Sequence, residues 1–359
     1  MACCLAASLA LSGCKEIHDM NVFSSGSGEG GRSDKVQGKF IDSVRSDLKT
    51  VSNVSPADQQ EAWDRDVGYV RYGNKTVANL PELQQYLGQV LATLGNELPG
   101  GTAGIKIYIT PQQDFEAYTL ENGAIFVSLG TLLSLKSEDE LAALLAHEFA
   151  HVLLDHHSKD TFEIMTQYGM RYANLYLQAR SEAGASQEDR MQKLKIANWV
   201  TDKALFPNWN KGQENDADIL AVDLLVQSGY NADAMASMLK KVEQTVAEKK
   251  EFVAQNPVKV TEKAKQQNDL NIDLDVLAAN AVGSLEHQLD RDYESAKVRQ
   301  KKVRDYLKTV HKKRPRPGYR KAEYQAAFQQ NDTEPRISQY RSAHDAEAAL
   351  LDENQGLSK

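Results

Sequence analysis

The sequence predicts an α+β protein that is predominantly helical, with one small β-sheet. Residues 105–109, Ile-Lys-Ile-Tyr-Ile, alternate apolar and other side chains as a half-buried strand does. A weaker strand pattern follows at 115–119, and after a Glu-Asn-Gly turn a third strand is expected at 124–128. The rest reads as helix, with breaks at turn residues such as Gly184 and Gly229. The expected helices are two or three within 35–98, then 129–136, 138–157, 159–183, 187–205, 213–228, 231–247 and 278–310.

Length and charge exclude some classes of function. The chain has 359 residues, which is enough for a sizeable core, and a net charge of −8. That charge gives no basis for nucleic-acid binding, which usually needs a basic face. No apolar run of the length that spans a bilayer follows the N-terminus, so the mature chain is not expected to cross a membrane.

The N-terminus is typical of an exported lipoprotein. Met1 to Leu11 is small and apolar, and Leu11-Ser12-Gly13-Cys14 resembles the site where bacterial lipoproteins are cleaved and lipidated. Residues 1–13 are therefore expected to be a signal peptide, and Cys14 to carry a lipid. The alternative is a short buried helix. Lys15 after the cysteine favours an outer-membrane lipoprotein that faces the periplasm over one kept at the inner membrane.

The remaining organisation is one domain with flanking segments. Residues 14–34 are rich in Gly and Ser and form a flexible tether. A single domain is expected over 35–310, with a polar helical insertion at 158–210 that either covers a cleft or extends the helical shell. Residues 311–359 are expected to be a polar, solvated tail. Its basic run at 312–316 leaves contact with a membrane surface as the alternative.

His147-Glu148-Phe149-Ala150-His151 is the motif that carries chemistry. Histidines four residues apart differ by about 40° around a helix, so both can bind one metal ion. Glu148 lies about 100° away, where its carboxylate can reach a water on that metal. Ser137 and Glu140 form a capping-box pattern at the start of this helix. The pattern predicts a zinc site, and the alternative is a helix whose histidines only satisfy core hydrogen bonds.

Zinc in such a site needs a third protein ligand. Cysteine is excluded, because all three cysteines lie within the first fourteen residues. His156 and His157 lie near the helix end, where they are expected to face solvent. Glu214 and Asp218 are four residues apart on a helix, so one can bind zinc while the other orients a zinc-binding histidine. The alternative is an acidic helix N-terminus that only favours the helix dipole.

These residues resemble the HtpX-like zinc peptidases related to the prenyl-protein proteases, metallopeptidase family 48. The resemblance covers about residues 80–305. It is carried by Asn-Gly-Ala-Ile-Phe-Val-Ser-Leu-Gly at 122–130, by the segment 139–151 that ends in the HExxH motif, and by Glu-x-x-Ala-Asp at 214–218. It implies a zincin-like fold, with the small sheet beside the HExxH helix.

The resemblance also implies roles. One Zn²⁺ per chain would be bound by His147, His151 and Glu214. Glu148 would act as general base and His287 would assist near the metal. Asp218 and Arg299 would support the ligands from outside. An edge strand would pair with an extended substrate through residues that include Asn122, Gly123, Ala124, Ile125 and Phe126.

The function implied is that of a zinc endopeptidase, gluzincin-like, acting on unfolded or misfolded envelope proteins. It would be held to the membrane only by its lipid. One alternative is a lipoprotein that keeps the zinc fold but binds clients with little or no proteolysis. Another is a structural lipoprotein whose HExxH motif is accidental.

Overall fold

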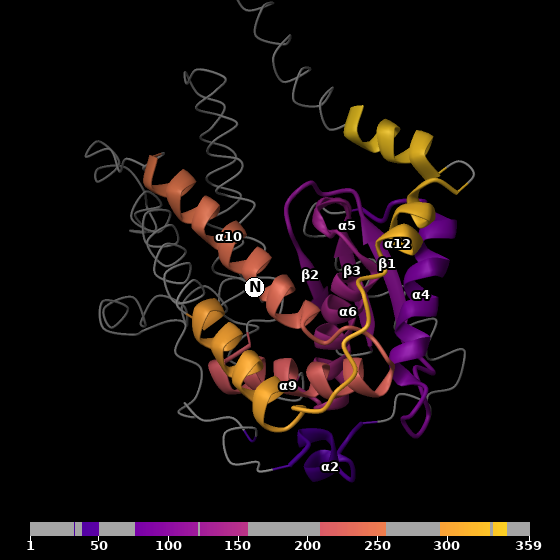
Figure 1. Cartoon of the computed structure of the whole chain (residues 1–359). Helices are drawn as coiled ribbons and strands as arrows, with labels where there is room; N and C mark the ends of the chain where they lie inside the picture. Colours follow the sequence, from indigo (N-terminus) through magenta and orange to yellow (C-terminus); the bar gives the residue numbers. More distant parts are fainter. Residues whose placement is uncertain are drawn as a thin grey trace, which may run out of the picture.

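Helices cover one face of a three-stranded sheet in the computed structural model, which describes residue 32 and residues 38–49, 76–120, 123–156, 209–255, 295–330 and 333–342. The helix with the HExxH motif is α6 (Glu138–Leu153), which packs on α9 (Lys211–Gln227) (Figure 1). α6 also contacts helices and a strand on its other sides. The predicted fold class, mainly helical with one small sheet, is confirmed. The helices expected at 159–183 and 187–205 lie outside the described residues.

The N-terminal helices supply one wall of the core. α4 (Pro81–Gly95) begins at a proline, whose fixed φ and missing N–H suit the first helical position. Its buried side chains recur at helical spacing and pack into the main core; they are Leu83, Leu87, Val90, Leu91 and Leu94. α2 (Phe40–Val44) is short and also buries its apolar side chains in this core.

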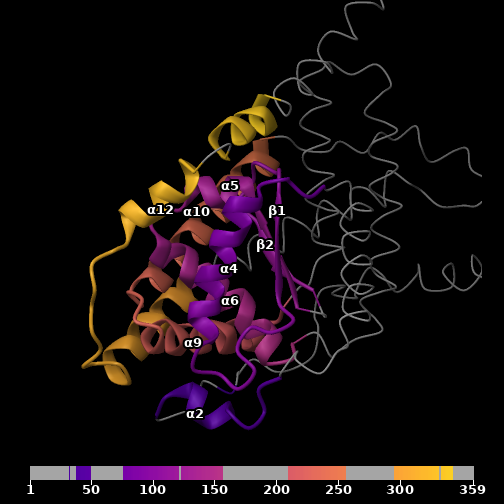
Figure 2. The ribbon, with the colours of Figure 1, turned by 90° about the vertical axis from the view of Figure 1, so that its right-hand side faces the viewer.

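The sheet has the order β1-β3-β2, with β1 (Lys106–Thr110), β2 (Ala117–Thr119) and β3 (Ala124–Ser128). β1 and β3 are parallel, whereas β2 and β3 are antiparallel. Figure 2 shows α4 and α6 on the same side of the strands. One face of the sheet contributes Ile107, Ile109, Ile125 and Val127 to the main core. On the other face Phe126 stacks between the rings of Tyr108 and Tyr118, at centroid distances of 5.0 and 5.2 Å.

β3 is the central strand, which corrects the expectation that it is an edge. Both of its sides are occupied, because the weak strand pattern near 115–119 forms β2 and pairs with it from Ala117↔Val127 to Thr119↔Ile125. Gly123, with φ 85°, sits in the turn that brings β2 back beside β3. The side chains of Ala124, Ile125 and Phe126 are fully buried. The edge strand on the α6 side is therefore β2.

Capping bonds start the two helices that follow the sheet. Ser128 accepts a hydrogen bond from Thr131 N and begins α5 (Leu129–Ser134). Ser137 accepts one from Glu140 N at 3.2 Å and begins α6. The predicted capping box is only half formed, because the Glu140 carboxylate accepts from Lys136 N rather than from Ser137 N. These bonds fix where α6 begins.

α6 ends earlier than the expected residue 157. Leu154 is its C-cap, and Asp155 has φ 52°, in the left-handed region that ends helices. His156 N still donates to His151 O at 3.1 Å, so the chain folds back over the last turn. Every side chain from Asp139 to Leu153 is buried.

α9 and α10 (Ala234–Gln255) complete the described helical layer behind α6. α9 begins with a full capping box between Asn210 and Gln213. Its next turn is buried although it carries polar and acidic residues, because these have partners: Asp216 accepts from Arg32 N, and Asp218 contacts His147 and Arg299. The predicted range of 213–228 for this helix agrees closely with the structure.

The chain after residue 310 is part of the fold, which corrects the expectation of a solvated tail over 311–330. Residues 295–309 are helical, 314–320 are extended, and α12 (Lys321–Phe328) follows. Tyr324 and Ala327 are buried in the main core, and Tyr324 OH donates to Leu132 O at 2.5 Å. Arg320 N donates to the buried carboxylate of Asp139 at 2.6 Å. Residues 343–359 lie outside the described range.

A buried carboxylate holds the helix 295–309 in place. Asp223 of α9 is fully buried and accepts hydrogen bonds from Tyr306 OH at 3.0 Å and from Ile41 N at 2.8 Å. His311 Nε2 lies 2.5 Å from the same carboxylate. These bonds join α2, α9 and the helix 295–309, so the side chains that this helix presents to α9 are firmly positioned.

Candidate metal centre

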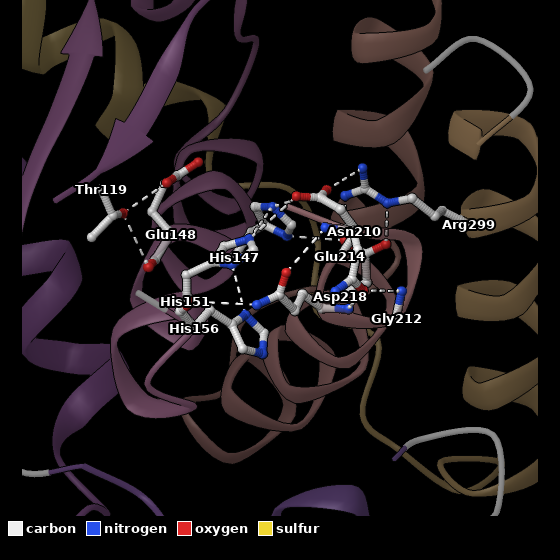
Figure 3. Close-up of polar contacts among 11 residues, drawn as sticks. Thr119, His147, Glu148, His151, His156, Asn210, Gly212, Glu214, Asp218 and Arg299 are labelled. Carbon is white, nitrogen blue, oxygen red and sulfur yellow. Dashed lines mark hydrogen bonds and ion pairs between the residues drawn. The ribbon is translucent and has the colours of Figure 1, made fainter. Parts of the chain in front are cut away.

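Three side chains from α6 and α9 converge on one point. His147 Nε2 and His151 Nε2 face each other at 3.1 Å. Glu214 Oε2 lies 3.7 Å from His147 Nε2, and Glu214 Oε1 lies 3.5 Å from His151 Nε2 (Figure 3). Among the described residues, this is the group of three potential ligands that could hold a metal ion. The spacing of the sequence motif and the packing of α9 on α6 together produce it.

The separations fit a tetrahedral ion. With bonds of about 2.0–2.1 Å to nitrogen and oxygen, the ligand atoms of a tetrahedral zinc lie about 3.3–3.4 Å apart. The separations of 3.1, 3.5 and 3.7 Å, the last two measured to different oxygens of Glu214, bracket that value. Two imidazoles and one carboxylate are also a donor set that suits zinc and leaves a fourth position open. The residues present therefore fit the ion.

Asp218 orients one of the two histidines. Its Oδ1 lies 3.0 Å from His147 Nδ1, which leaves Nε2 of that ring for the metal. Burial would lower the pKa of His147, but the hydrogen bond that it donates to Asp218 and the charges of Glu214 and Asp218 outweigh it, so this pKa is raised. Burial would likewise raise the pKa of Asp218, but its neighbours hold it below the ordinary value.

Arg299 is the neighbour that lowers the pKa of Asp218 most. Its Nε and Nη2 donate to the two Asp218 oxygens at 2.6 and 2.7 Å, a two-point contact. Its Nη1 lies 2.5 Å from Glu214 Oε2. One guanidinium thus compensates two buried or half-buried carboxylates and fixes their spacing on α9. The structure thus places Arg299 in direct contact with Asp218 and Glu214.

Glu148 lies on the sheet side of the histidines. It is 6% exposed, and its Oε2 accepts a 2.7 Å hydrogen bond from Thr119 Oγ1 of β2. Burial raises the pKa of Glu148, against the lowering effects of His147 and of the Thr119 hydroxyl. Sequence reasoning missed Thr119. The signal that was available is the period of the strand, which turns Thr119 to the same face as Ile125 and hence toward α6.

His151 has its own neighbours, which sequence reasoning also missed. His156 Nδ1 lies 2.8 Å from His151 Nδ1, so His156 is turned inward, which corrects the expectation that it faces solvent. The indole of Trp209 stacks on the His151 ring at a centroid distance of 4.5 Å and an angle of 17°. The fold-back of the chain after Leu153 creates the first contact, and no periodic pattern signals it.

Three predicted site residues have no described position. Cys14, Asn122 and His287 lie outside the described residues. Gly123 lies in the β2–β3 turn, and the other predicted strand residues lie in the buried centre of the sheet. The described site therefore consists of potential metal ligands on α6 and α9, a carboxylate beside them, and an arginine in contact with Asp218 and Glu214.

A helix with two histidines, a carboxylate ligand from a second helix and a neighbouring glutamate define a metallopeptidase-type site. The family pattern of Peptidase family M48 matches residues 80–302, and the chain belongs to this family. The match contains every described member of the site and stops before α12.

Curated relatives agree with the family. The chain is 26% identical over 184 residues to the Metalloprotease YcaL of Escherichia coli K12, covering 51% of this chain and 68% of that one. It is 28% identical over 164 residues to the Metalloprotease LoiP of the same strain, covering 45% and 60%. It is 25% identical over 207 residues to a putative beta-barrel assembly-enhancing protease of Vibrio cholerae, covering 55% and 40%. These matches support a metalloprotease.

Proposed function

We propose that this protein is a zinc-dependent endopeptidase of the bacterial cell envelope. The observation that carries the proposal is the convergence of His147 Nε2, His151 Nε2 and the Glu214 carboxylate, with a buried Glu148 beside them. Family membership supports the same reaction class. One Zn²⁺ per chain is the ion that this donor set suits.

The reaction assigned to the site is hydrolysis of a peptide bond by water. Zinc held by the three ligands would lower the pKa of a water and polarise the scissile carbonyl. Glu148 would act as general base toward the attacking water and would pass the proton to the amine nitrogen as the peptide C–N bond breaks. Its Oε1 accepts no hydrogen bond from the described residues, so it is the oxygen assigned to the proton, while Oε2 is held by Thr119. Asp218 and Arg299 keep His147 and Glu214 in position.

The substrate would be an extended, unfolded segment of protein. β2 is the edge strand that contacts α6. Ser128 N donates to Glu116 O and Leu120 N donates to Ala124 O, so the backbone groups of Ala117 and Thr119 turn to the open edge. A peptide that pairs there would bind through its backbone with little sequence preference. Such tolerance suits the removal of misfolded proteins.

The envelope role rests on two supports. The Leu-Ser-Gly-Cys sequence at 11–14 resembles a lipidation site, with lipid on Cys14 and an outer-membrane location facing the periplasm. The relatives from Vibrio cholerae and Yersinia pestis are named for enhancing β-barrel assembly. None of the described helices is long and apolar enough to cross a membrane. Quality control of envelope proteins is the task that combines these features.

The test compares wild type with Glu148→Gln, both carrying Cys14→Ser and loaded with zinc. Zinc stoichiometry is measured first, and then cleavage of an unfolded protein such as reduced casein. We expect both proteins to bind one zinc, and only wild type to cleave. Zinc binding without cleavage by wild type would replace this proposal by the alternative of a client-binding lipoprotein. Failure of both to bind zinc would refute the metal site itself.

A further inference from the structure

The most basic part of the described chain is residues 295–321, which include the helix 295–309 that carries Arg299. Residues 295–321 contain twelve Lys and Arg and a single acidic residue, Asp305, in a chain whose net charge is −8. The first part of this segment is the helix 295–309, and the rest is the segment that joins it to α12. The basic run at 312–316 is therefore the end of a longer basic surface that belongs to the folded domain.

The charges are sorted around the helix. Its inner side consists of Ala296, Gln300, Val303 and Leu307, all buried. Lys297, Lys301, Arg304 and Lys308 follow at spacings of four, three and four, so they form one exposed flank roughly 60° wide. Lys312 and Lys313 extend it beyond the helix and are also exposed. We call these six residues the basic face.

The basic face points away from the metal centre. At 100° per residue, Arg299 lies roughly 170° around the helix from the middle of the basic flank. Figure 3 shows Arg299 pointing toward Glu214 and Asp218. A partner on the basic face would therefore leave the site open on the opposite side of the helix.

Exposed apolar side chains distinguish this surface from the surface of an ordinary solvated helix. Among the described residues, the large hydrophobic side chains that are exposed are Val298 at 54% and Tyr319 at 36%. Both lie in the basic segment, and Val298 is on the solvent side of the same helix. Basic side chains combined with exposed apolar and tyrosine side chains are the composition of a surface that lies on a lipid headgroup layer.

We propose that the basic face docks this protein on an anionic phospholipid surface, with the metal centre turned away from the lipid. Lys and Arg would contact lipid phosphates, while Val298 would reach the boundary of the headgroups. The proposal is independent of catalysis and complements a lipid on Cys14.

The test uses the full chain with Cys14→Ser and vesicles of two compositions, phosphatidylcholine alone or with about 30% phosphatidylglycerol. Any contribution of the apolar N-terminus is common to all variants. The face variant replaces Lys301, Lys308, Lys312 and Lys313 by Gln. The matched control replaces four other exposed lysines, Lys39, Lys136, Lys211 and Lys240, by Gln, with the same change of net charge.

We expect wild type and the control to bind the anionic vesicles at least about tenfold more tightly than the neutral ones. The face variant should lose most of that preference, and salt should weaken the binding of wild type. Equal losses in the face variant and the control would overturn the proposal, since only net charge would matter. So would equal binding of wild type to both vesicles. Casein cleavage by the face variant should equal that of wild type, which separates this test from the test of the peptidase.

Discussion

Thr119 Oγ1 donates a 2.7 Å hydrogen bond to Glu148 Oε2 and also lies 3.2 Å from the backbone oxygen of Glu148. The bond joins the edge strand β2 to the helix that carries the metal-binding histidines. Because the backbone of Thr119 faces the open edge, this one residue connects the proposed substrate strand to the proposed base.

Replacing Thr119 by Val should lower kcat about tenfold or more while KM stays within about twofold, since a hydrogen bond to a charged group contributes about 1.5–3 kcal/mol. Thr119→Ser keeps the hydroxyl and should restore most of the activity. Steady-state cleavage of a fluorogenic peptide is the measurement, with zinc stoichiometry as the check on folding. An unchanged kcat in the Val variant would show that Glu148 does not need this partner.

Arg299→Ala should destabilise the metal-free protein by about 3 kcal/mol. The Asp218 side chain is 1% exposed, and removing a partner from a buried ion pair leaves an uncompensated charge. Zinc should restore part of the loss, because the cation compensates the same cluster of carboxylates. Urea unfolding with and without zinc measures both effects. Lys308→Ala, on the exposed side of the same helix, serves as the control and should change stability by less than about 0.5 kcal/mol.

Zinc affinity should depend on pH, and the protonation of His147 sets the direction of this dependence. The raised pKa of this histidine keeps a proton on the metal-free ring to a pH above its ordinary 6.5, and zinc must displace that proton. Affinity should therefore still increase as pH rises through and beyond about 6.5. Asp218→Asn removes the neighbour that raises this pKa, so the increase should move to lower pH. It should also weaken zinc binding by about 10–100-fold at high pH, because the ring loses its orienting partner.

Competition with a chromophoric chelator measures this affinity over a range of about pH 5.5–8.5. Asp216→Asn is the control, since Asp216 lies on the same helix and its Oδ2 accepts from Arg32 N. A midpoint that stays in place in Asp218→Asn would mean that Asp218 does not govern protonation of the ring.

The segment after the family match should prove necessary for stability. Tyr324→Ala is expected to cost about 3–5 kcal/mol, because Tyr324 is only 4% exposed in the main core. Tyr324→Phe removes only the bond to Leu132 O and should cost about 1 kcal/mol. Thermal or urea unfolding distinguishes the two. If Tyr324→Ala were as stable as wild type, residues beyond 310 would be accessory to the fold.

Local patterns predicted most of the described elements. The range 124–128 and the beginning of α6 at Ser137 were read correctly, because alternation and capping are encoded within a few residues. Two motifs, HExxH at 147–151 and Glu-x-x-Ala-Asp at 214–218, also predict that Glu214 groups with the two histidines. What local patterns do not encode is pairing between elements. β3 was expected to be an edge, because a three-residue partner such as β2 gives almost no periodic signal.

The other differences between prediction and structure also arise from contacts between elements, which local patterns do not encode. The role of Thr119 depends on which face of β2 meets α6, and the inward turn of His156 depends on the chain folding back after Leu153. The tail was read as solvated because its composition is polar, yet a few side chains such as Tyr324 and a backbone bond from Arg320 N to Asp139 hold it to the domain. Tertiary contacts outweighed composition there.

The described site combines His147 with residues as far along the chain as Arg299. These residues are far apart in the sequence, so they are synthesised at different times. An unfolded precursor has neither the two helices side by side nor the guanidinium that compensates their carboxylates. Peptidase capacity is therefore a property of the folded domain alone. An unfolded chain therefore has no assembled site, and the proposed zinc binding and hydrolysis both depend on complete folding of the domain.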